Sequence, residues 1–593
     1  MLKFIDMNFF KQVLATIVGI IVTFGILFFG FIILIGVLVQ QSTSEMAVVA
    51  PSNSVLQLSF DYDIIEKSES NPFGDLNLPL YNIKKSIGLN DILARIEAAK
   101  MDDNIKGIYL SPTTVNVGFA SLKAIRDALV DFKSSGKFVV AYSDNYSQRA
   151  YYLSSVADKV YLNPQGSLDF RGLSSNVIFM KDALDKLGVE MQVIKVGTYK
   201  SAVEPFILNE MSDPNRQQVT SYLNSVYDAF LTDLAEGRKI SKDSLHHIAN
   251  EFLVRNADDA LRYKFIDAKL YKDELITDMK KRLDIAEDKD ISTVSILNYA
   301  GSKLNESKGE KIAVLYAYGD IVDGEGENDE IGGERISREL RKLRNDKDIK
   351  AVVLRVNSGG GSALASDVIW REVELTKKEK PIMVSMGDYA ASGGYYIAAA
   401  ADSIFAEKGT LTGSIGVFGL VPNFKGLLNN KLGVNIDEVN TGKYSSLMSN
   451  PEKPLTAEER AIIQAEVNNT YTTFMTRVAN GRNKTIAQVD SIGQGRVWTG
   501  QQAVELGLVD RIGNLKTAVR AAASKAKIDN YQVVEYPAKT DAFANILSSS
   551  KDKIKMWMIG EELGEYQKYL LDIRKNLKHT GIQARIPYQI EIY

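Results

Sequence analysis

The chain has 593 residues, of which 45% are hydrophobic and 24% are charged. That length exceeds what one hydrophobic core supports, so at least two domains are expected, and the composition is that of a folded protein rather than a disordered chain or a protein with many membrane spans. A formal net charge of -3 gives no broad positive surface for nucleic acid, and the absence of cysteine excludes disulfides, a thiolate nucleophile and a cysteine metal site.

The amino-terminal region contains a long apolar run from Leu14 to Val39, and no charged residue occurs between Lys11 and Glu45. With a rise of about 1.5 Å per residue, a helix over this run is long enough to cross a bilayer of about 30 Å. The alternative is a cleaved secretory signal, but the run exceeds the roughly 7–15 apolar residues of such a segment. We expect a transmembrane anchor over residues 13–40. The lysines before it place residues 1–12 in the cytoplasm and the remainder outside.

A repeat with a spacing of 244 residues runs through the rest of the chain. NIKGIYL from Asn104 lies against DIKAVVL from Asp348, and FVVAYSDNYSQRAYYL from Phe138 lies against IMVSMGDYAASGGYYI from Ile382. Because the landmarks keep their order and their spacing, they indicate two copies of one unit.

Within each unit, short apolar runs alternate with longer amphipathic stretches. Ala351 to Val356 and Ile382 to Ser385 are typical strands, while Ser337 to Arg344 and the segment from about 458 to 480 are predicted helices. This alternation favours βαβ units around a largely parallel sheet. The predicted fold class is α/β, with two tandem domains after one transmembrane helix.

The repeat also sets the predicted domain boundaries. The first repeat is placed at residues 45–300 and the second at 301–540, with the joint in the polar segment that begins at Gly301. Residues 541–593 have no counterpart in the first unit and form a carboxy-terminal extension. We interpret the extension as a packing tail or an oligomer contact.

Duplicated units differ where one copy carries chemistry that the other lacks. The second unit has a glycine-rich loop, NSGGGS from Asn357 to Ser362, where the first has TTVNVG. Glycines allow the backbone to turn tightly and to approach a ligand closely. The alternatives are a flexible turn or a phosphate-binding loop, and the P-loop pattern GxxxxGK[ST] is absent.

A serine marks a second difference between the units. Ser392 lies in DYAASGGYY, from Asp388 to Tyr396, at a predicted strand-to-helix turn where the N–H of Gly393 can face an oxyanion. Most serines in turns are only turn or capping residues. Ser392 is singled out because the glycine loop agrees with it and because the first unit has Gln148 at the equivalent position.

A nucleophilic serine needs a base, and the chain has only three histidines, His246, His247 and His579. The first unit carries Lys200 in VGTYKSAVEPF, where the second has TGKYSS. Although most lysines are solvated surface residues, a buried lysine with a lowered pKa can act as a general base. Lys200 is the predicted base, and Lys443 of the second unit is its rival.

Together these motifs resemble the signal peptide peptidase A family in its long, tandem-repeat form, which is related in fold to the ClpP and crotonase group. AASGGYY is similar to the family's nucleophile motif and marks Ser392, while GTYKSAVEPF is similar to its general-base motif and marks Lys200. The family's NSPGGS loop is present as NSGGGS, with Gly359 in place of proline.

The resemblance implies further site residues. Gly360 and Gly393 would donate the oxyanion-hole N–H groups, and Ser414, in LTGSIGVFG, would hold the lysine amine. Asp388 is a further candidate for a supporting role. Neither a metal nor another cofactor is implied.

The resemblance also implies a function and an assembly. We expect tandem ClpP/crotonase-like domains in a homotetramer at the inner (cytoplasmic) membrane, with the catalytic part on the periplasmic side. The substrates would be signal peptides left after secretion, and the amino-terminal helix would contact lipid. Two alternatives stay open: a crotonase-type acyl-CoA enzyme, and a non-catalytic membrane scaffold of the same fold.

Overall fold

The computed structural model describes residues 49–68, 85–303, 309–538 and 581–586, and also 15–16, 18–20, 22–26 and 30. The other residues of the predicted anchor at 13–40 and most of the carboxy-terminal extension lie outside the described residues. A search of the described residues found no helix with both the length and the apolar character needed to cross a membrane.

A parallel six-stranded sheet forms the centre of the first repeat. Its strand order is β8 (Ala268–Lys269), β6 (Lys159–Leu168), β5 (Phe138–Tyr146), β4 (Ile105–Leu110), β1 (Ser54–Leu58) and β9 (Thr293–Ser295). The helices of this repeat include α2 (Leu89–Met101), α3 (Phe119–Lys133), α4 (Gln148–Ser154), α7 (Asp213–Arg238), α8 (Lys242–Asn250), α9 (Ala257–Arg262) and α10 (Lys272–Leu283). Leu275 and Met279 of α10 pack on one face of the sheet, and α2, α3 and α4 pack on the other.

The second repeat has a corresponding sheet of eight strands. Its main path is β19 (Val497–Thr499), β17 (Leu411–Gly413), β15 (Ile382–Ala391), β13 (Ile349–Ser358), β10 (Glu310–Tyr318) and β21 (Tyr531–Tyr536), with β16 (Ser403–Ala406) and β20 (Arg511–Ile512) beside β15. Every pair except β17 with β19 is parallel. Strand β13 is buried at all but two positions, as expected for a parallel strand covered on both faces.

The helices of the second repeat follow those of the first in order. They include α11 (Gly333–Asn345), α12 (Ala363–Glu379), α13 (Gly393–Ala398), α14 (Ala457–Arg482), α15 (Ile486–Ile492), α16 (Gly500–Glu505) and α17 (Leu515–Ala526). Strands β4 and β13 begin at Ile105 and Ile349, and the 26-residue helices α7 and α14 begin at Asp213 and Ala457, in both cases 244 positions apart. The predicted tandem α/β organisation is confirmed, as are the helices predicted at α11 and α14.

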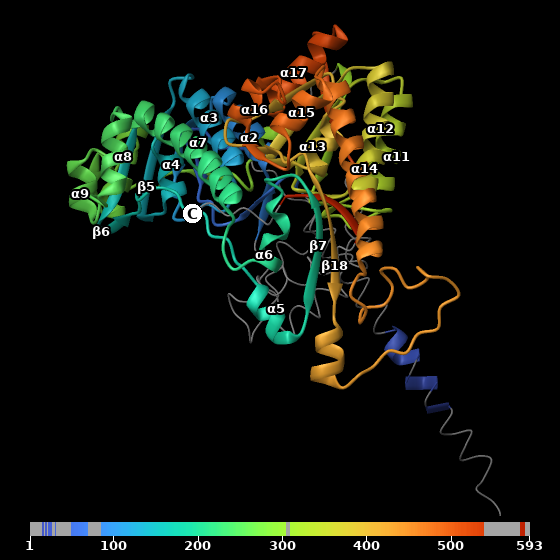
Figure 1. Cartoon of the computed structure of the whole chain (residues 1–593). Coiled ribbons are helices and arrows are strands. Elements are labelled where there is room, and N and C mark those ends of the chain that lie inside the picture. Colours follow the sequence, from blue (N-terminus) through green and yellow to red (C-terminus); the bar gives the residue numbers. More distant parts are fainter. Residues whose placement is uncertain are drawn as a thin grey trace, which may run out of the picture.

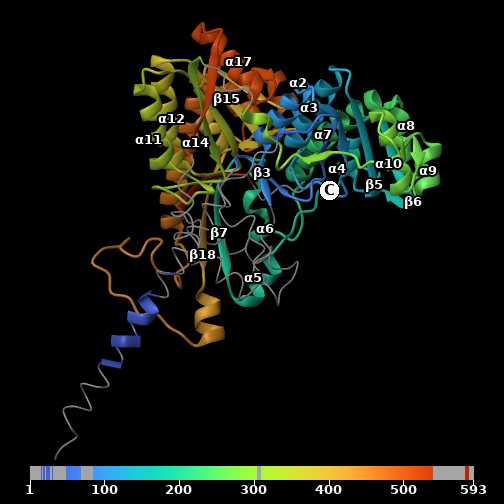
Figure 2. The ribbon, with the colours of Figure 1, turned by 180° about the vertical axis from the view of Figure 1, so that it is seen from behind.

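A third sheet joins the two repeats. Its strand order is β12 (Glu330–Gly332), β11 (Asp320–Val322), β14 (Gly360–Ser362), β22 (Gly581–Arg585), β18 (Val417–Asn423) and β7 (Glu190–Val196). Strand β7 belongs to the first repeat in sequence but pairs with β18 of the second along its whole length. Figures 1 and 2 show β7 and β18 side by side, with the short helices α5 (Lys181–Leu187) and α6 (Glu204–Ile207) next to β7.

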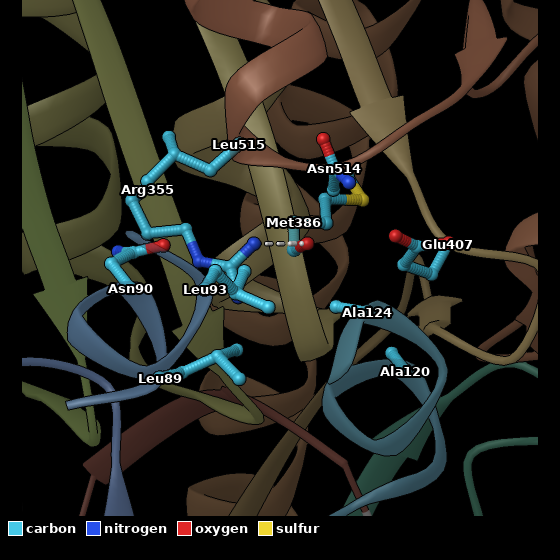
Figure 3. Close-up of a pocket in the computed structure, with 10 residues that line it drawn as sticks. All are labelled: Leu89, Asn90, Leu93, Ala120, Ala124, Arg355, Met386, Glu407, Asn514 and Leu515. Atoms are coloured by element: carbon cyan, nitrogen blue, oxygen red, sulfur yellow. Dashed lines mark hydrogen bonds between the residues drawn. The ribbon is translucent and has the colours of Figure 1, made fainter. Parts of the chain in front are cut away.

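The repeats also pack directly against each other. Figure 3 shows Leu89 and Leu93 of α2 facing Arg355 and Leu515 of the second repeat, around a cavity of about 10 Å³. This volume is about that of one water-sized probe, so the contact is close. Arg355 donates to the carbonyl of Met386 at 2.7 Å (Figure 3).

Candidate active site

Ser392 lies at the turn between strand β15 and helix α13, as the sequence predicts. Its backbone angles are φ 56° and ψ -114°, a combination that a residue with a side chain rarely adopts. Its N–H donates to Gly413 O at 2.8 Å, and its own carbonyl accepts from Tyr396 N at 2.8 Å. Serine nucleophiles on sharp strand-to-helix turns have this strained geometry, which presents the hydroxyl at the tip of the turn.

Lys200 approaches Ser392 from the first repeat. Its Nζ donates to Ser392 Oγ at 2.9 Å, to Ser414 Oγ at 3.1 Å and to Ser414 O at 3.2 Å. All three residues have no exposed surface. The hydroxyl of Ser414 donates in turn to Gly495 O at 3.3 Å, so its oxygen is free to accept from the lysine. The structure therefore brings together three residues singled out in the sequence.

Burial governs the charge of this lysine. Desolvation lowers the pKa of Lys200 well below 10.5. Burial is the sole cause of this lowered pKa, and among the described residues no carboxylate offsets it by favouring the charged form. A neutral amine next to a hydroxyl can accept the proton of that hydroxyl.

The β7–β18 ladder and one glycine position this lysine. The ladder runs from Glu190 paired with Asn423 to Val196 paired with Val417, and Lys200 follows it closely. A Cβ added to Gly495, whose φ is +78°, would lie 2.7 Å from Lys200 Cα. Only glycine allows the two backbones to approach this closely. Gly495 is not among the residues predicted from the sequence, although its motif GQGR, with two glycines close together, is a signal for a tight backbone contact.

The two glycines predicted as oxyanion donors lie in contact. Gly360 has φ +102°, and a Cβ added to it would lie 2.7 Å from Gly393 N and 2.1 Å from the carbonyl oxygen of Ala584. The N–H of Gly360 donates to Ser358 Oγ at 3.1 Å in this structure. The position between the two glycine backbones is thus next to a peptide carbonyl of β22.

Asp388 is not brought to Lys200. Its carboxylate accepts from Ser121 N at 2.9 Å and from Ser121 Oγ at 2.7 Å. Ser121 is in the first turn of α3, which has no side-chain cap of its own at Gly118. The carboxylate of the second repeat therefore caps a helix of the first. The contacts of Asp388 indicate a role at the junction of the repeats.

Lys443 and Gln148 are also in different surroundings from Lys200 and Ser392. The side chain of Lys443 is 64% exposed and pairs with Glu458, whose hydrogen bond raises the pKa of the lysine. Gln148, at the position equivalent to Ser392, donates to Gly172 O at 2.9 Å and accepts from Arg171 N at 3.1 Å. The amide of the first repeat thus holds a loop, and the Ser–Lys pair takes its lysine from the first repeat and its serine from the second.

Comparison with known proteins identifies the family. Residues 131–286 and 374–529 each match the model of peptidase family S49. The chain belongs to peptidase family S49. It is 36% identical over 522 residues to Protease 4 of Haemophilus influenzae, covering 84% of this chain and 83% of the relative. It is 32% identical over 503 residues to the chloroplastic serine protease SPPA of Arabidopsis thaliana, and this match covers 82% of this chain and 72% of the relative.

The predicted family is confirmed, and the chain is a serine protease with two S49 domains. This sets aside the acyl-CoA enzyme and the non-catalytic scaffold. A solved structure of ClpP1 from Listeria monocytogenes is 16% identical to this chain, with a TM-score of 0.22; the match covers 34% of this chain and 91% of the ClpP1 chain. Lys200 lies in the first S49 segment, and Ser392 and Ser414 lie in the second.

Proposed function

We propose that Ser392 is the nucleophile of this serine protease and Lys200 its general base. The observation that carries the proposal is the 2.9 Å hydrogen bond from Lys200 Nζ to Ser392 Oγ in a fully buried site. Nucleophile and base at hydrogen-bonding distance, with the base held by a third group, are the arrangement that covalent catalysis requires. Ser414 is that third group here, because both its hydroxyl and its carbonyl accept from the amine.

The reaction follows from the neutral state of the amine. Lys200 takes the proton of Ser392 Oγ as the oxygen attacks the peptide carbonyl, and the resulting ammonium protonates the departing nitrogen as the C–N bond breaks. An acyl-enzyme on Ser392 remains. Water then attacks the ester with Lys200 again as base, which releases the carboxylate product and restores the hydroxyl.

The negative charge that develops on the carbonyl oxygen needs donors. Gly360 and Gly393 are proposed to supply them through their amides, because their backbones lie in contact beside Ser392. The Gly360 N–H bonds to Ser358 Oγ in this structure, so it would exchange that bond for the oxyanion as the substrate reacts.

The proposed substrates are signal peptides left after secretion, cut at the periplasmic side of the inner membrane by a homotetramer. The apolar run from Leu14 to Val39 supports an anchor that would hold the protease next to apolar peptides in the bilayer. A relative from Enterococcus faecium, 37% identical over 260 residues, is named a putative signal peptide peptidase, which agrees with this substrate class.

The catalytic pair is tested with Ser392→Ala and Lys200→Ala in the full chain. Both variants should lose cleavage of a synthetic signal peptide, measured by mass spectrometry of the products, and Ser392→Ala should also lose labelling by a fluorophosphonate. Lys443→Ala is the matched control, because that lysine is exposed. Turnover at the wild-type rate in Lys200→Ala would refute the assignment of the base.

The membrane topology is tested separately. Because the chain has no cysteine, single cysteines can be introduced by Asp6→Cys and by Lys408→Cys at an exposed site. A membrane-impermeant maleimide should label the second variant in intact spheroplasts and the first only after lysis. Equal labelling of both before lysis would contradict the proposed orientation.

A further inference from the structure

Strand β15 has a bulge shortly before the nucleophile. Its pairing with β13 runs to Val356 opposite Met386 and resumes only with Ser358 opposite Ala390. Between these pairs, one residue of β13 lies opposite three residues of β15. Extra residues on one strand bend that strand and re-aim the side chains that follow. The shape of this bulge therefore decides where the turn at Ser392 presents its hydroxyl.

The one residue of β13 opposite the bulge is Asn357, and its side chain holds the bulge. Its Oδ1 accepts from Tyr389 N at 2.9 Å, and its Nδ2 donates to Glu66 Oε1 at 2.7 Å. Because a backbone N–H only donates and a carboxylate only accepts, only this orientation of the amide makes both bonds. A Cβ added to Gly387 would lie 2.8 Å from both Asn357 Cγ and Glu66 Oε1, so the bulge packs closely on these two side chains.

Glu66 belongs to the first repeat, where it directly follows β2 (Asp63–Ile65). Its side chain is 7% exposed, and it accepts from Arg355 Nε at 3.0 Å and from Arg355 Nη2 at 3.2 Å. The arginine donates in turn to Ser385 Oγ at 3.0 Å and to Met386 O at 2.7 Å (Figure 3). One carboxylate of the first repeat thus fixes β15 before the bulge through the arginine, and the bulge itself through the asparagine.

The other residues of the bulge also have partners outside β15. Thr410 Oγ1 donates to Gly387 O at 2.8 Å, and Asp388 accepts from the N–H and the hydroxyl of Ser121. Together with the bond to Asn357, each of the three bulge residues is held by a side-chain hydrogen bond. A buried polar network whose members are all satisfied specifies one arrangement. The bulge therefore has a fixed shape.

We propose that Glu66 is a positioning residue for the nucleophile: through Asn357 it holds the bulge in the shape that brings Ser392 Oγ to Lys200. The inference rests on the proposed function, because it takes Ser392 as the nucleophile. Glu66 acts on the hydroxyl through the backbone of β15. The first repeat therefore supplies the base and also sets the orientation of the serine that the base meets.

A displaced serine hydroxyl should affect the chemical step more than the binding of substrate. A catalytic group misplaced by about 1 Å can cost about 100-fold in rate. Loss of the bond between Glu66 and Asn357 should therefore lower kcat by about tenfold or more and leave KM within about twofold. Fluorophosphonates react with the same hydroxyl, so the rate constant of labelling should fall together with kcat.

Glu66→Gln and Glu66→Leu separate positioning from stability. Both variants leave the Arg355 guanidinium buried without its counterion, so both should lower the free energy of unfolding by similar amounts. Glutamine keeps an oxygen that can accept from Asn357 Nδ2, whereas leucine has none. We expect kcat of Glu66→Gln to stay within about threefold of wild type, and that of Glu66→Leu to fall by about tenfold or more. Equal kcat in the two variants would overturn the proposal.

Two further variants keep the test independent of folding. Glu66→Leu combined with Arg355→Met has no buried unpaired charge, so it should fold, but Asn357 still lacks its acceptor and kcat should stay low. A wild-type kcat in this double variant would overturn the proposal. Glu372→Leu is the matched control, because this carboxylate is also buried and pairs with Arg341 and Arg344 on α11. It should lower stability and leave kcat unchanged.

The measurements are kcat and KM for a fluorogenic peptide, and the rate of fluorophosphonate labelling, at a temperature at which urea unfolding shows each variant to be folded. A fall of kcat in Glu372→Leu as large as that in Glu66→Leu would assign the loss to stability and sink the inference. Absence of labelling at Ser392 in the wild type would overturn the catalytic assignment and this inference with it. Labelling of wild type and Glu66→Leu at the same rate would overturn the inference alone.

Discussion

Val196 of the first repeat pairs with Val417 of the second at the end of the β7–β18 ladder. Lys200 follows Val196 and Ser414 precedes Val417 by only a few positions, so the register of this ladder sets where the amine meets its acceptors. A slip of one residue would turn every side chain of β7 to the opposite face. The pairing between the repeats, rather than either repeat alone, assembles the site.

Proteolysis should depend on the ionisation of Lys200. Burial lowers the pKa of this lysine well below 10.5, and the base must be neutral to accept a proton. We expect kcat/KM to fall as the pH drops through the lowered pKa and to be level above it. The measurement is kcat/KM for a fluorogenic peptide across the pH range in which the fold is intact. A profile controlled only by an ionisation near 10.5 would contradict the role of burial.

Ser414→Ala should shift that profile towards lower pH. The Ser414 hydroxyl accepts from Lys200 Nζ at 3.1 Å, and an acceptor stabilises the protonated amine. Its removal should lower the pKa of Lys200 further, and kcat should fall because the amine loses its orientation. The pH profile and kcat are compared with those of Ser449→Ala, at an exposed serine. An unshifted profile would show that the carbonyl of Ser414 is sufficient.

Sequence patterns predicted the two α/β repeats because alternating apolar and amphipathic segments report which surfaces are buried. They also selected Ser392, because the first copy has Gln148 at that position, and Lys200, because the second copy has a different segment, TGKYSS, there. The bond from Asp388 to Ser121 could not be predicted, since it depends on how the repeats pack. Strand β22 was missed because it has no equivalent in the first repeat, so comparison of the copies gave no signal for it.

The backbone strain at Ser392 should be measurable. A φ of 56° with a ψ of -114° suits glycine but not alanine. Ser392→Gly and Ser392→Ala both remove the hydroxyl and should both be inactive, yet the glycine variant should have the higher free energy of unfolding, by about 1 kcal/mol. Urea denaturation of the two variants provides the comparison. Equal stability would mean that the turn relaxes once the hydroxyl is gone.

Lys200→Met should change how stability depends on pH. Between the lowered pKa of the folded state and the value near 10.5 of the unfolded chain, the unfolded state binds one more proton, so wild-type stability rises with pH in this window. Methionine fills a similar volume and carries no proton, so this slope should be lost. Thermal unfolding is followed as a function of pH, with Lys443→Met as the exposed control. An identical slope in Lys200→Met would assign it to other groups.

Replacing only one partner of the ion pair between Glu66 and Arg355 should lower the free energy of unfolding strongly. Arg355 Nε lies 3.0 Å from Glu66 Oε2, and their side chains are 6% and 7% exposed, respectively. Glu66→Ala would leave the guanidinium buried without its counterion, which typically costs about 3–5 kcal/mol. Glu66→Leu combined with Arg355→Met removes both charges and should recover most of that loss, because the desolvation cost disappears together with the attraction. Urea unfolding of the single and double variants measures the loss of stability in Glu66→Ala and its recovery in the double variant. A double variant less stable than Glu66→Ala would mean that the bonds of Arg355 to Ser385 and Met386 contribute more to the junction than the ion pair does.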